Sequence, residues 1–176
     1  LVDVTNYVLM ELGQPLHAFD ADTIEGDIVV RLAQPAETIT LLNEQTITLT
    51  GDELLIADDK GALALAGIMG GQRSSVTDST TNIVLESAFF NPLAIAARAR
   101  RFGLHTDASQ RFERGVDFEL PELALARAVD LITSVTGSQA GQIVKVENIV
   151  HLPTRTPITL PISKVREVIG IEIEPA

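Results

Sequence analysis

The chain contains no cysteine and no tryptophan, and only 4% of its 176 residues are aromatic. The absence of cysteine excludes disulfide bonds and thiolate metal sites, and it fits a reducing compartment such as the cytoplasm. Basic residues are also few, because 13 Lys and Arg stand against 24 Asp and Glu, a formal net charge of −11. Such a charge repels phosphate backbones on average, so any contact with nucleic acid needs a local basic patch.

Long apolar runs are missing as well. No run reaches the ~18 residues needed to span a bilayer, so we expect a soluble, cytoplasmic domain with no membrane partner. Apolar residues still make up 45% of the chain, enough for a real core. The chain opens at Leu1 on a patterned apolar run, which suggests a piece of a longer protein.

The middle of the chain is predicted to be β, because β-branched and apolar runs alternate with turn residues. Hairpin turns are expected at residues 43–45 and 58–61. Expected helices end at glycine signals, and residues 14–20 between the first helix and the strands are expected to form a loop. The predicted strands are 28–32, 38–42, 46–50, 54–57, 62–66, 83–90 and 143–150, and the predicted helices are 6–12, 93–101, 107–114 and 120–135.

This order predicts an α+β fold: an antiparallel β-rich body of hairpins, barrel- or sandwich-like, flanked by helices, with no βαβ alternation. We expect one domain over residues 1–154. Residues 155–176 are expected to begin a following, incomplete domain, with a strand over 156–162 and a helix over 163–169.

Glu86 is the most informative single residue. In the predicted strand its period of two places it on one face with Val84, Ala88 and Phe90. A carboxylate among apolar side chains needs a hydrogen-bond partner. The candidates are an arginine, backbone amides or a donor group of a ligand. The alternatives are an ion pair with an arginine of the next helix, or a strand edge open to water.

Residues Arg98–Asp117 hold five of the thirteen basic residues and His105, a local excess that suggests an anion or polar ligand, or simply a solvated helix surface. Thr106 or Asp107 is equally consistent with a helix cap. The glycines of residues 67–71 indicate either close approach to a ligand or a turn, because the segment lacks the phosphate-loop lysine. His17 is expected in a loop, and no histidine spacing predicts a metal site.

Several long motifs occur in one order along the chain. Together they resemble the β subunit of bacterial phenylalanyl-tRNA synthetase, in its third-and-fourth-domain (B3/B4) editing module, and the tail from about residue 156 resembles the start of that family's next domain. The matching segments are Val2–Tyr7, Gly13–Asp20, Ala66–Gly71, Leu85–Pro92 and Arg100–Asp117.

The resemblance implies a module that hydrolyses tyrosine mistakenly attached to tRNA(Phe), within an α2β2 phenylalanine-tRNA ligase whose synthetic site, with ATP and Mg, lies on the α subunit. Neither cofactor is implied in this chain. No protein nucleophile is implied; a positioned water attacks, so His17 is assigned to binding. The implied pocket residues are Thr5, His17, Gly67, Gly70, Glu86 as the reader of the tyrosine hydroxyl, Thr106 and Ala108.

The competing interpretation is a non-catalytic scaffold that packs against the α subunit and supports tRNA. Because the chain is acidic, we expect low activity from it in isolation.

Overall fold

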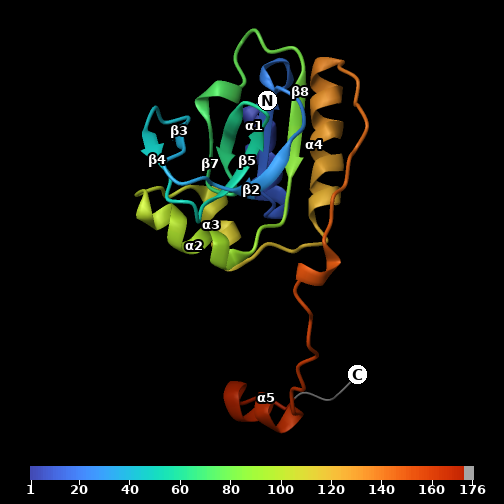
Figure 1. The fold of residues 1–176 in the computed structure, drawn as a ribbon. Helices are drawn as coiled ribbons and strands as arrows, with labels where there is room; N and C mark the ends of the chain where they lie inside the picture. The colour runs from blue at the N-terminus through green and yellow to red at the C-terminus, as the bar shows by residue number, and fades with distance from the viewer. Residues whose placement is uncertain (173–176) are drawn as a thin grey trace. The chain divides into compact units, whose positions relative to one another are not determined.

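A computed structural model describes residues 1–172 of the chain, which divides into two compact units, residues 1–142 and 143–176. The predicted domain boundary, between residues 154 and 155, falls inside the second unit. The first unit is α+β with antiparallel strand pairs, as the sequence predicts (Figure 1).

An antiparallel ribbon of two strands organises the first unit. β1 (Leu16–Asp20) pairs with β8 (Ile83–Ser87), although more than sixty residues separate them. One face of the ribbon carries Leu16 and Leu85, which pack with the helices α1 (Val2–Leu12) and α4 (Pro121–Thr136). Figure 1 shows α4 running beside β8.

The other face of the ribbon belongs to the main core. It carries Phe19, which is 1% exposed, and Val84, and the predicted period of two for β8 is confirmed because Val84, Ala88 and Phe90 all join this core. The core continues into a four-stranded sheet in the order β2-β5-β6-β7 and a separate hairpin, β3-β4. These strands are β2 (Val29–Leu32), β3 (Thr38–Thr40), β4 (Thr46–Thr48), β5 (Leu54–Asp58), β6 (Gly61–Leu65) and β7 (Met69–Gly70).

Helices α2 (Pro92–Arg101) and α3 (Asp107–Arg114) pack together and against the same core through Ile95, Ala99 and Phe112. Asn91 caps α2, which begins one residue before the predicted start, and Thr106 caps α3, which begins where the sequence predicts. Short 3₁₀ turns fill the connections at Ala21–Thr23, Gln72–Ser74 and Ile149–His151.

The loop predicted over residues 14–20 is wrong, because most of it forms β1. Pro15 and the turn-forming neighbours hide the strand, and its partner β8 lies too far along the chain for local patterning to reveal. β7, which is only two residues long, was also not predicted.

The second unit corrects two further strand predictions. Residues 143–148 and 156–161 have apolar, β-branched patterns but form no strand, and residues 149–151 form a 3₁₀ turn. Each segment is largely exposed and has no paired neighbour among the described residues, so its backbone is not held in a ladder. The helix expected nearby is present as α5 (Ile162–Ile169).

No helix within residues 1–172 combines the length and apolar character needed to cross a membrane.

We predict that Gly67→Ala destabilises the chain more than Gly103→Ala does. The two glycines have φ of +68° and +66°, so both alanines are strained by about 1–2 kcal/mol. Only at residue 67 would the new Cβ lie 2.9 Å from a Phe90 ring carbon, which adds about 1–3 kcal/mol of overpacking. Urea unfolding of both variants measures the difference, and equal losses would show that the core yields at residue 67.

Candidate functional site

Two candidate residues face each other across the β1–β8 ribbon. The register places His17 directly opposite Glu86, and opposed residues of an antiparallel pair project from the same face. That face is the one occupied by Phe19 and Val84, so the pair lies at the margin of the main core. His17 also meets the Phe19 ring edge-on, with ring centroids 4.6 Å apart.

Glu86 is a half-buried carboxylate that makes no hydrogen bond or ion pair among residues 1–172. Burial raises its pKa to about 7, because the charged form loses solvation that no donor replaces. The expected alternative of an arginine from the next helix is wrong, since Arg98 and Arg101 of α2 bind Asp52. The carboxylate is therefore available to a ligand.

His17 presents a neutral ring to the same space. Burial lowers its pKa to about 4, and its Nε2 atom is buried with no hydrogen-bond partner in the described residues. A polar atom in that condition is stabilised when a ligand or a water supplies the missing partner. The Glu86 carboxylate and the His17 Nε2 atom therefore lie on the same face, and each lacks a hydrogen-bond partner among the described residues.

Gly70 of β7, in the four-stranded sheet, packs against the His17 ring. A Cβ added to Gly70 would lie 2.6 Å from His17 Nε2 and 3.1 Å from the Leu42 side chain. The His17 ring thus packs directly on the glycine backbone, and only a residue without a side chain fits there. The N–H of Leu42 donates to Gly70 O. Because the Leu42 side chain is 47% exposed, this end of the site lies near the protein surface.

Gly67, Thr106 and Ala108 each make contacts that serve the fold. The space beside Gly67 is filled by Phe90, Phe112 and Ile95, so this glycine serves core packing and a turn. The Thr106 hydroxyl donates to Ile68 O at 2.9 Å and accepts from Ser109 N, in a capping box that confirms the cap prediction. Ala108 packs against the main core.

Two other sequence candidates lie on helix α1 and in the turn before α3. Thr5 lies on α1, and its hydroxyl donates to Val2 O at 2.9 Å. His105 is exposed in the turn before α3. The roles of all seven pocket residues remain predictions; among them, His17 lies opposite Glu86 in the ladder and packs on Gly70.

The arginines of residues 98–114 mostly serve the fold. Arg101 binds both Asp52 and the fully buried Glu53, which ties the end of α2 to the loop before β5. Arg111 pairs with Asp107, and Arg114 with Glu113. The helix-surface interpretation of this basic segment is therefore supported over an anion site.

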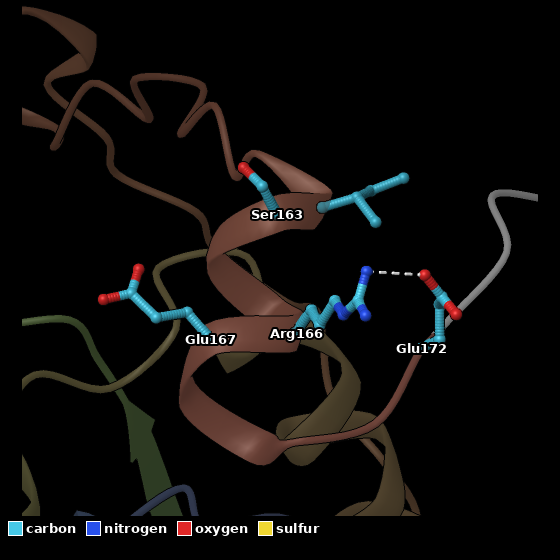
Figure 2. Close-up of a pocket in the computed structure, with 5 residues that line it drawn as sticks. Ser163, Arg166, Glu167 and Glu172 are labelled. Carbon is cyan, nitrogen blue, oxygen red and sulfur yellow. Dashed lines mark hydrogen bonds and ion pairs between the residues drawn. The ribbon is translucent and has the colours of Figure 1, made fainter.

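Two open hollows lie elsewhere and contain none of these residues. One flanks α5 in the second unit, where Arg166 donates to Glu172 at 2.8 Å (Figure 2). The other lies in the first unit between β3, β6 and the Gln72–Ser74 turn, with its Lys60 and Arg73 paired to Glu25 and Asp58. Within residues 1–172 no group of three His, Asp or Glu side chains is arranged to hold a metal ion.

The fold and site together define an α+β domain with an unpaired carboxylate and imidazole at the junction of two sheets. Residues 1–137 match the family model described as the B3/4 domain, and the chain belongs to that family.

Relatives at the whole-chain level are β subunits of phenylalanine-tRNA ligases. The protein from Psychrobacter arcticus is 93% identical over 99% of this chain, and the one from Acinetobacter baylyi is 60% identical over 99%. Each alignment covers 22% of the relative, so the chain spans about a fifth of the curated proteins it matches.

One solved structure, an N-terminal fragment of the phenylalanyl-tRNA synthetase β-subunit from Pyrococcus horikoshii, aligns with a TM-score of 0.44 at 14% identity. That alignment covers 80% of this chain and 51% of the fragment.

We predict that Glu86→Gln stabilises the chain at high pH but not at low pH. Because the folded pKa of about 7 lies above the ordinary 4.5, the folded chain binds more protons than the unfolded one between these values. The glutamate therefore costs stability that grows as pH rises through this window, on the order of 1–3 kcal/mol by pH 8.

Urea unfolding of the 176-residue chain at pH 4.5 and pH 8 measures this difference. The control is Glu44→Gln, at an exposed glutamate that makes no side-chain hydrogen bond among the described residues. A gain from Glu86→Gln of the same size at both pH values would contradict the buried, unpaired carboxylate.

Proposed function

We propose that this chain is the editing part of a phenylalanine-tRNA ligase β subunit and hydrolyses tyrosine wrongly esterified to tRNA(Phe). The observation that carries the proposal is the unpaired, half-buried Glu86 carboxylate opposite His17. The family match and the names of the relatives support the assignment to a β subunit, and with it a role in protein synthesis.

Glu86 is the group that reads the amino acid. Tyrosine differs from phenylalanine by one hydroxyl, and a hydrophobic synthetic pocket rejects such an isostere weakly. A second site that accepts a hydrogen bond from that hydroxyl discriminates strongly, because phenylalanine leaves its buried acceptor unpaired. The phenol O–H donates to Glu86, whose apolar neighbours Val84 and Ala88 strengthen the bond.

His17 orients the substrate. With its pKa lowered to about 4, the ring is neutral near pH 7 and is too weak a base to hold a proton from water. Its unpaired Nε2 fixes a polar group of the substrate or a water instead. In the reaction, water adds to the ester carbonyl, the bond to the ribose oxygen breaks with a proton returned to that oxygen, and free tyrosine leaves.

The proposal places the chain in a cytoplasmic enzyme with an α subunit and tRNA(Phe) as partners. The site described above recognises the amino acid, and it leaves most nearby arginines committed to ion pairs within the domain. Contacts that hold the tRNA therefore come largely from other parts of the enzyme, and the isolated chain is expected to be weakly active.

We expect Glu86→Ala in the whole enzyme to abolish the preference for Tyr-tRNA over Phe-tRNA in hydrolysis. A buried carboxylate that accepts the tyrosine hydroxyl accounts for roughly 10²-fold or more of discrimination. Deacylation of both purified esters measures it, with phenylalanine attachment as the control for integrity. Unchanged selectivity removes Glu86 from the site, and no hydrolysis by the parent enzyme favours the scaffold interpretation.

We expect Gly70→Ala to lower Tyr-tRNA hydrolysis roughly tenfold or more while phenylalanine attachment is unchanged. The added methyl would displace the His17 ring, and small displacements of a binding group have effects of this size. Gly141→Ala is the matched control, because neither glycine has a positive φ and the Cβ at residue 141 meets nothing within 4 Å. Full hydrolysis by Gly70→Ala would show that the His17 position is immaterial.

A further inference from the structure

Gln14 lies two residues before β1, next to Pro15, and is completely buried, at 0% exposure. Its side-chain Nε2 donates to Ala88 O at 2.8 Å and to Pro15 O at 3.1 Å. Two carbonyl partners fix the orientation of the amide, because the reversed orientation would direct its oxygen at both of them. The bond to Ala88 crosses from the start of β1 to the residue just after β8.

The ladder of the ribbon explains why a side chain is needed at this point. Opposite residues of an antiparallel pair alternate between those that exchange backbone hydrogen bonds and those that do not. Ala21 N–H donates to Asn82 O at 3.0 Å, so the exchanging pairs that follow along the register are Phe19 with Val84 and then His17 with Glu86.

The next exchanging pair in this alternation is Pro15 with Ala88. Proline has no backbone N–H, so the ladder bond from residue 15 to Ala88 O cannot form. The Gln14 amide donates to that same carbonyl and takes the place of the missing bond. Without it, His17 and Glu86 would form the last pair that exchanges two backbone hydrogen bonds, one residue from the Leu16–Ser87 end of the ribbon.

We propose that Gln14 is a positioning residue for the His17–Glu86 pair: its side-chain amide supplies the ladder bond that Pro15 lacks and holds the two site residues in register. This inference rests on the proposed function for its effect on hydrolysis, but the ladder itself can be measured independently. Gln14 contributes no atom to the substrate-binding face in this role and acts through the ribbon.

The test uses the whole enzyme with three variants: Gln14→Met, Pro15→Ala and the double variant. Methionine keeps the length of the side chain and removes the donor, and it also removes the Gln14 Oε1 atom, which is buried without a partner among the described residues. Pro15→Ala restores a backbone N–H that can donate to Ala88 O. Gln110→Met is the control, at an exposed glutamine of α3 whose side chain makes no hydrogen bond in residues 1–172.

We expect Gln14→Met to lower Tyr-tRNA hydrolysis roughly 10- to 100-fold, by loosening the geometry of the pair, with phenylalanine attachment unchanged. Pro15→Ala alone and Gln110→Met should stay within about twofold of the parent. The double variant should recover most of the lost rate, a rescue that a general packing defect at residue 14 would not give.

Hydrogen exchange of peptides covering residues 14–20 and 83–90 separates this inference from the proposed function. Exchange should be faster in Gln14→Met and slower again in the double variant, whether or not the parent hydrolyses Tyr-tRNA. Parental exchange in Gln14→Met, or no recovery in the double variant, overturns the role of Gln14. A parent without hydrolysis, but with the expected exchange pattern, overturns the proposed function alone and leaves the ladder role supported.

Discussion

The first unit depends on the antiparallel pairing of β1 with β8. This pairing closes a loop of more than sixty residues that contains the four-stranded sheet and the β3–β4 hairpin, so the ribbon joins both ends of the β body. Its register also decides the site, because a shift of one residue would turn Glu86 from the main core toward α1 and α4. Fold and candidate chemistry are therefore set by the same hydrogen bonds.

Glu86 stands out when it is compared with the other buried acids of the unit. Glu53 accepts from Thr50, Gly51 and Arg101, and the Asp58 carboxylate binds Arg73 and three backbone amides. Those carboxylates are saturated with donors, which lower their pKa and explain their place in the fold. The Glu86 carboxylate has no such donors among the described residues. Polar groups without hydrogen-bond partners are found preferentially at functional sites.

Local patterns predicted those parts of the structure that local forces determine. The cap at Thr106 fixes the start of α3, and the period of two correctly placed Glu86 on the core face of its strand. The position of His17 opposite Glu86 was not predictable, since it depends on a pairing across the whole domain and on a strand hidden behind Pro15. The role of Gln14 was not predictable either, because it depends on Pro15 lacking an N–H at one position of the β1–β8 ladder.

The charge distribution bears on the proposed editing function, in which a mischarged tRNA must be both held and recognised. With most arginines of residues 98–114 bound to acids of the same unit and a net charge of −11, little positive potential is left for a phosphate backbone. Contacts with the nucleic acid are weakened by salt, whereas a hydrogen bond to a half-buried carboxylate is screened much less. Under the proposed function this charge distribution suits recognition of the amino acid, and we expect surfaces elsewhere in the enzyme to capture the RNA.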